Sequence, residues 1–83
     1  MGKKENGILE KYGAENIKFY CLINNYGYTF KINGVKYDIR FWENCYGAYI
    51  GKWSVMPADM NDAGDYIRMD KELQRKIEEE FNA

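Results

Sequence analysis

Few side chains in this 83-residue sequence could carry out acid–base or nucleophilic chemistry. The sequence has no histidine, and its aliphatic hydroxyl groups belong to Thr29 and Ser54 alone. Without histidine there is no Ser-His-Asp hydrolysis and no histidine-ligated metal. Cys45 lies in a predicted turn, but a reactive thiolate needs a neighbouring base or cation, and the candidates are Lys52 and Arg40. We therefore predict that the protein is not an enzyme.

Two segments partly match ligand-binding loops, and each departs from its pattern. Residues 47–54 have two glycines and a lysine, but the glycines are too close together for a phosphate-binding loop. In addition, Trp53 follows Lys52 where a magnesium-binding Ser or Thr is needed. Residues 59–70 have some oxygen donors of a calcium loop, but the final ligand is Asp70 where a longer glutamate is expected. We predict no cofactor and no metal site.

Charged and aromatic residues are more informative than these loops. Residues 1–56 carry eight basic and five acidic side chains, whereas residues 57–83 carry four basic and eight acidic ones. The sequence has 8 Tyr, 4 Phe and 2 Trp, too many for a small sheet with one covered face to bury. Exposed Tyr and Trp are typical anchors of protein interfaces. The predicted partner-binding residues are three aromatic, two basic and three acidic ones: Tyr20, Trp42, Tyr46, Lys36, Arg40, Asp59, Asp62 and Asp65.

These features predict a small binding or regulatory protein that acts by protein–protein contact. The residue usage is typical of AT-rich coding sequences, which favours a phage or mobile element and the inhibition of a host defence protein. An alternative is a nucleic-acid or nucleotide-binding module, in which sheet aromatics stack on bases beside Lys31, Lys36 and Arg40. The net charge of −1 argues against strong capture of nucleic acid. A homodimer through the exposed aromatics also stays open.

Length and patterning predict one domain over residues 1–83 in the cytoplasm, with no membrane partner. The longest uncharged apolar run, residues 19–23, has five residues, whereas a membrane helix needs about 20. The first four residues are followed by Glu5 and not by the apolar region of a signal peptide. Cys21 and Cys45 have neither a CxxC nor a metal-ligand spacing, which fits free thiols in a reducing compartment.

The strongest structural signal is a β-hairpin around Asn33-Gly34. This dipeptide tolerates the two positive φ angles of a type I′ turn, and an alternating run flanks it on each side. A two-residue loop places all apolar side chains of both runs on one face. The predicted pairs are Ile32 with Val35, Phe30 with Tyr37 and Tyr28 with Ile39.

The remaining elements complete an α+β fold. Residues 71–82 are predicted to form a helix with Asp70 as its N-cap and an apolar stripe of Leu73, Ile77 and Phe81. Residues 48–56 read as a strand, residues 65–69 as a short strand, and residues 8–12 as a short helix. Residues 17–24 favour a strand, with a helix over residues 14–23 as an open alternative. The predicted fold is an antiparallel sheet of three to five strands with the C-terminal helix packed on one face.

Overall fold

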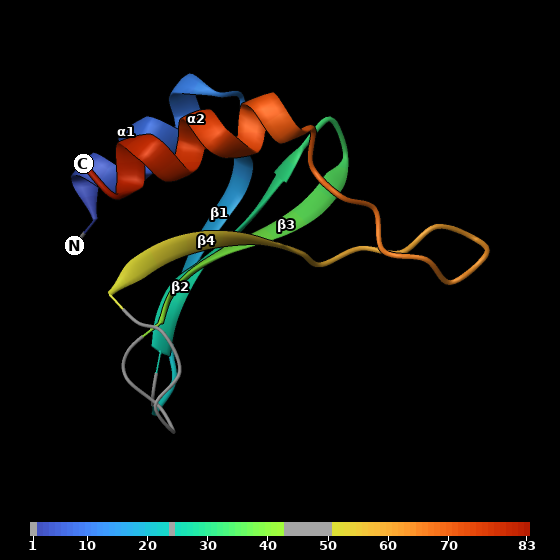
Figure 1. The fold of residues 1–83 in the computed structure, drawn as a ribbon, viewed down its shortest axis with the longest axis horizontal. Helices are drawn as coiled ribbons and strands as arrows, with labels where there is room; N and C mark the ends of the chain where they lie inside the picture. The colour runs from blue at the N-terminus through green and yellow to red at the C-terminus, as the bar shows by residue number, and fades with distance from the viewer. Residues whose placement is uncertain (1, 24, 43–50) are drawn as a thin grey trace.

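The computed structural model describes residues 2–23, 25–42 and 51–83. Its elements, in chain order, are α1 (Lys3–Lys11), β1 (Glu15–Cys21), β2 (Asn25–Ile32), β3 (Val35–Trp42), β4 (Lys52–Pro57) and α2 (Lys71–Phe81). The strands form one antiparallel sheet in the order β1-β2-β3-β4. Both helices lie on the same face of this sheet (Figure 1). The predicted α+β fold is confirmed, and no helix among the described residues is long and apolar enough to cross a membrane.

The hairpin of β2 and β3 has the predicted turn and register. Asn33 and Gly34 have φ angles of 53° and 79°, as a type I′ turn requires. The Cα partners include the three predicted apolar pairs Ile32–Val35, Phe30–Tyr37 and Tyr28–Ile39. The apolar residues of these pairs therefore share the face that the helices cover, which we call the inner face.

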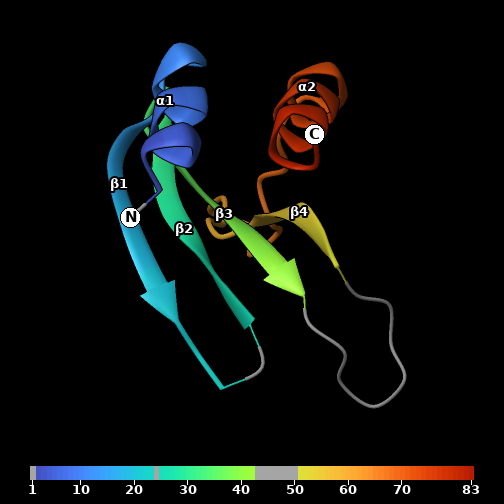
Figure 2. The same ribbon diagram turned by 90° about the vertical axis from the view of Figure 1, so that its left-hand side faces the viewer.

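The core lies between the inner face and the two helices. Leu9 of α1 and Ile77 of α2 are fully buried, as are Phe30 and Ile39 of the sheet. Glu80 of α2 joins the helices, because it accepts hydrogen bonds from the Tyr12 hydroxyl and from Lys11 Nζ at the end of α1. Figure 2 shows that the helices cover one end of the sheet, while the strands continue beyond them. One end of the inner face is therefore left without a helix.

The helix α2 begins and packs as predicted. Asp70 Oδ2 accepts hydrogen bonds from the backbone N–H groups of Glu72 and Leu73, each at 3.1 Å. Ile77 and Phe81 are buried, and Leu73 packs partly buried against the same core. The amphipathic stripe of the sequence thus identifies the covered face of this helix.

Three boundaries differ from the sequence-based expectation. Residues 15–21 form a strand, which confirms the strand favoured over residues 17–24 with shifted bounds and excludes the alternative helix over residues 14–23. The strand has a β-bulge near Asn16, whose φ is 55°. Residues 65–69 do not form a strand; Tyr66 makes a single bridge to Met60. β4 begins at Lys52 and includes Pro57, and residues 48–50 of the predicted strand lie outside the described residues.

Gly27 occupies the tightest point of the sheet. A Cβ atom there would lie 2.2 Å from the Ile39 carbonyl oxygen and 3.0 Å from both Arg40 Cα and the Tyr20 hydroxyl. Two of these neighbours are backbone atoms, so a side chain forces the strands apart. We expect Gly27→Ala to lower the free energy of unfolding by about 1–3 kcal/mol, as measured by urea denaturation.

The matched control is Gly7→Ala in α1. A Cβ atom at Gly7 meets nothing within 4 Å, and its φ angle is not positive. Alanine there should stabilise the helix by about 0.5–1 kcal/mol. Equal effects of the two substitutions would contradict the close approach at Gly27.

Candidate functional site

The two edges of the sheet differ in how their backbone groups are satisfied. At the β4 edge, the Trp53 N–H donates to Asn82 Oδ1 at 2.8 Å, and Asn82 Nδ2 donates to the Trp53 carbonyl at 3.1 Å. The Val55 N–H donates to Glu78 Oε2 at 2.8 Å. Pro57 lies two residues after Val55, at the next outward position of β4, and has no N–H to donate. Side chains of α2 and a proline therefore close this edge against strand addition.

The β1 edge has no such cover among the described residues. Leu22 N–H donates to the Asn25 carbonyl at 2.7 Å, on the side where β2 lies. Because successive residues of a strand direct their amides to opposite sides, Phe19 and Cys21 direct theirs away from β2. Within residues 2–23, 25–42 and 51–83, no side chain accepts a hydrogen bond from either amide.

At the C-terminal end of β1 the exposed side chains are apolar. Phe19 is 40% exposed, Leu22 56% and Ile23 95%, and the free thiol of Cys21 is also exposed. These residues belong to the longest uncharged apolar run of the sequence, residues 19–23, which we call the β1 edge site. An edge strand that combines free amides with apolar side chains is a template for pairing with another chain.

A row of aromatic rings continues from the β1 edge site across the open end of the inner face. The Phe19 ring lies 5.3 Å from that of Tyr28 and 6.2 Å from that of Tyr26. Tyr26 stacks on Phe41 at 5.3 Å, and Trp53 meets both of these rings edge-on. Rings held against one another lose little conformational freedom when a partner covers them.

The outer face, opposite the helices, holds a buried carboxylate. Asp38 is only 7% exposed, and its oxygens accept hydrogen bonds from the Tyr20 hydroxyl at 2.8 and 3.0 Å. Arg40 donates through Nη2 to Asp38 at 2.7 Å and through Nε to the Tyr20 hydroxyl at 2.7 Å. Tyr20 reaches Asp38 because Gly27, its partner on β2, has no side chain in between. Burial, followed by the hydrogen bond to Asp38, raises the pKa of Tyr20 to about 12.

The predicted partner-binding residues that the structure describes lie on the outer face and in the loop after β4. Tyr20 and Arg40 lie together on the outer face, where both form hydrogen bonds with Asp38. Lys36 is exposed on the outer face, and its backbone N–H donates to Asp59 Oδ2 at 3.1 Å. The acidic residues Asp62 and Asp65 are exposed in the turn that follows. The Trp42 side chain and Tyr46 lie outside the described part of the chain.

Apart from Tyr20, the residues of the β1 edge site were missed by the sequence analysis, although their signal is present. Residues 19–23 are apolar at both odd and even positions, and a strand with one covered face cannot bury both sets. Apolar and polar residues alternate more strictly in β2 and β3, so the unbroken apolar run of residues 19–23 differs from them. Which strand lies at an edge, however, is a property of the sheet order.

No cluster of three or more His, Cys, Asp or Glu side chains suited to a metal ion occurs in the described residues. No protein-family model matches the sequence, no curated protein is significantly similar to it, and no solved structure matches it at a significant level. The arguments about function therefore rest on the geometry of the chain.

Tyr20 should make the stability of the protein depend on alkaline pH. Its pKa is higher in the folded protein than the ordinary value of 10, so its contribution is complete below pH 10. That contribution falls as pH rises from 10 towards 12, because the unfolded chain loses the proton first. We expect Tyr20→Phe to lower the free energy of unfolding by about 1 kcal/mol at pH 8. The difference from wild type should shrink above pH 10, as measured by urea denaturation at each pH.

The control for this experiment is Tyr66→Phe, at an exposed tyrosine whose hydroxyl has no hydrogen-bond partner in the described residues. It should leave stability unchanged at pH 8. A difference between Tyr20→Phe and wild type that stays constant from pH 8 to pH 12 would contradict the assigned role of Tyr20.

Removal of the Asn82 side chain should open the β4 edge. Asn82→Ala deletes both hydrogen bonds to the Trp53 backbone, and we expect a loss of about 1–2 kcal/mol in the free energy of unfolding. Amide hydrogen exchange at Trp53 should accelerate. The control Glu78→Gln retains an acceptor oxygen for the Val55 N–H and should have a smaller effect. Unchanged exchange at Trp53 in Asn82→Ala would show that Asn82 does not close the edge.

Proposed function

We propose that the protein is a non-enzymatic binding protein that acts by protein–protein contact, and that the β1 edge site is its contact surface. The observation that carries the proposal is the asymmetry of the sheet. One edge is closed by Asn82, Glu78 and Pro57, whereas the other combines exposed apolar side chains with amides that have no partner among the described residues. In this proposal an extended segment of the partner adds a fifth strand beside β1.

Hydrogen bonds and the burial of apolar side chains at the β1 edge site would both contribute to the affinity for the added strand. Phe19 and Cys21 each offer one N–H and one C=O to the added strand, and each hydrogen bond formed contributes about 0.5–1.5 kcal/mol. Burial of the exposed parts of Phe19, Leu22 and Ile23 contributes about 25 cal/mol per Å² of apolar surface. Loss of translational freedom opposes these terms, so the apolar contacts decide the affinity.

The added strand would extend both faces of the sheet. Its side chains on the inner face would meet Phe19 and the aromatic row, which favours apolar residues at alternate positions of the partner. Its side chains on the outer face would lie beside Lys18 and Tyr20, which favours polar or acidic residues at the positions between. This alternation is the specificity that we assign to the site.

The biological role of the protein is proposed from its size and residue usage and not from the geometry of the β1 edge site. A regulatory role, and more narrowly inhibition of a host defence protein by a phage or mobile element, is supported by the small size and residue usage alone. The exposed free thiol of Cys21 favours a reducing compartment such as the cytoplasm. Stacking of bases on Tyr20, the basis of the nucleic-acid alternative, receives no support from its engagement with Asp38.

Two substitutions at Cys21 test the proposal. Cys21→Pro removes an amide that points away from β2, so it blocks an added strand without deleting a hydrogen bond of the sheet. Cys21→Ser keeps the amide and serves as the matched control. Ten-residue peptides would be selected on the wild-type protein from a displayed random library, and their affinities measured by fluorescence anisotropy. We expect wild-type affinity in Cys21→Ser and at least about tenfold weaker binding in Cys21→Pro.

Each variant would first be checked by circular dichroism and thermal unfolding. Selected peptides should also protect the amides of Phe19 and Cys21 from hydrogen exchange. Equal affinity in the two variants, or peptides that protect other amides, would overturn strand addition at β1.

A further inference from the structure

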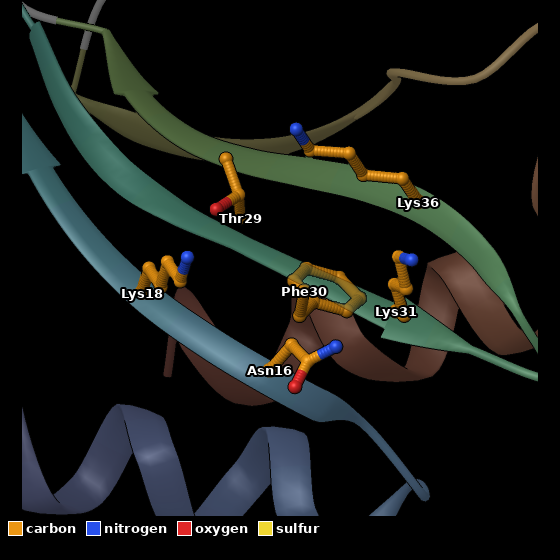
Figure 3. Close-up of a pocket in the computed structure, with 6 residues that line it drawn as sticks. All are labelled: Asn16, Lys18, Thr29, Phe30, Lys31 and Lys36. Atoms are coloured by element: carbon orange, nitrogen blue, oxygen red, sulfur yellow. The ribbon is translucent and has the colours of Figure 1, made fainter.

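The outer face contains a hollow lined by lysines from three neighbouring strands. Its volume is about 410 Å³, within the range of small-molecule sites. The lining residues are Asn16, Lys18, Thr29, Phe30, Lys31 and Lys36. Figure 3 shows these side chains on β1, β2 and β3, with the helices behind the sheet. We call this feature the lysine hollow; three of its six lining residues are cationic and none is acidic.

Two of the lysines are placed against each other. Lys31 and Lys36 are direct Cα partners in the ladder of β2 and β3, and like charges opposite each other destabilise a sheet. In the part of the chain that the structure describes, the ammonium groups of Lys18, Lys31 and Lys36 form no ion pair or hydrogen bond.

The nearby carboxylates do not neutralise these cations by direct contact. The oxygens of Asp38 already accept hydrogen bonds from Tyr20 and Arg40. Asp59 accepts from the backbone N–H groups of Lys36 and Met60. Glu15 is the ladder partner of Lys31 but forms no ion pair with it in the described structure. Positive charge is thus concentrated in a protein whose net charge is −1.

We propose that the lysine hollow binds the phosphate group of a phosphorylated ligand. Three ammonium groups are donors without acceptor capacity, and the Thr29 hydroxyl and the Asn16 amide add neutral donors in the same hollow. A phosphate dianion accepts several such hydrogen bonds at once, and lysine is a common phosphate ligand in proteins. The anion also relieves the repulsion between Lys31 and Lys36.

The hollow offers no platform for a nucleobase. Phe30 is the aromatic residue of its lining and is only 1% exposed, so its ring is not accessible for stacking. The Tyr20 ring is held by its contacts to Asp38 and Arg40 on the same face. Recognition therefore depends on the phosphate charge and not on a base. The lysine hollow contains none of residues 19–23, although Lys18 borders both surfaces. Lys31 and Lys36 take no part in the proposed strand addition, so variants at these two lysines test the phosphate proposal independently.

Calorimetric titration with inorganic pyrophosphate at low ionic strength tests the proposal. Lys31→Gln and Lys36→Gln should each weaken binding at least about fivefold, since each removes a charge-assisted hydrogen bond. The control Lys3→Gln removes an exposed lysine of α1, far from the hollow in the sequence, and should bind like wild type. Saturable amide shifts in the NMR spectrum should centre on Lys18, Thr29 and Lys31. Affinity should fall as salt is added.

Two further titrations determine whether the bound phosphate belongs to a small molecule or to a nucleic-acid backbone. A mononucleotide that binds as tightly as pyrophosphate identifies a small phosphorylated ligand. Stronger, Lys31-dependent binding of a ten-nucleotide single strand identifies a nucleic-acid backbone. Both outcomes require the lysine hollow as the phosphate site.

The variant Lys31→Glu distinguishes a loss of phosphate binding from a loss of folding. It replaces the like-charge pair with Lys36 by an opposite-charge pair but sets a second carboxylate opposite Glu15, so the two effects oppose each other and the melting temperature should stay close to that of the wild type. Pyrophosphate binding should be lost although this protein stays folded. Unchanged binding in Lys31→Glu, equal losses in Lys3→Gln, or no saturable binding by wild type would overturn the proposal.

Discussion

The turn at Asn33-Gly34 constrains the whole molecule, because its two-residue length sets the register of β2 and β3. With this register, the apolar side chains from Tyr26 to Phe41 lie on the inner face and the charged side chains of the hairpin lie on the outer face. A shift of one residue would exchange the faces and bury lysines beneath the helices. The core, the buried Asp38 and the lysine hollow all follow from this one alignment.

The helix α2 has a second role besides covering the core. Its apolar stripe packs on the inner face, while Glu78 and Asn82, at the border of that stripe, satisfy the outward amides of β4. Among the described residues, these contacts close the β4 edge and leave the β1 edge without an equivalent cover. α1 packs against the sheet and against α2 but supplies no hydrogen bond to the outward amides of β1 among the described contacts.

The outer face carries charge arrangements that do not favour stability. Asp38 is buried and depends on both Tyr20 and Arg40, so loss of either partner leaves a poorly solvated carboxylate. Lys31 and Lys36 stand opposite each other, and like charges in this arrangement repel. Proteins retain such local conflicts mainly where a site needs them, which is the physical basis of the phosphate proposal.

The sequence by itself determined the elements whose signals are local. Asn33-Gly34 determined the hairpin, and Asp70 with the stripe of Ile77 and Phe81 determined α2, because turns, caps and helical periodicity act over a few residues. It could not separate strand from helix for residues 15–21, since a short apolar run fits both periods.

Only the tertiary structure decided which surfaces are available. The sequence predicted Tyr20 and Arg40 as partner-binding residues, and sheet pairing brings both to Asp38 across Gly27. Residues 19–23 are an apolar run in the sequence, and sheet order puts them at an edge that neither helix closes among the described contacts. Edges and buried charges depend on contacts between residues far apart in the chain, and local patterns do not encode which strand is left without a neighbour.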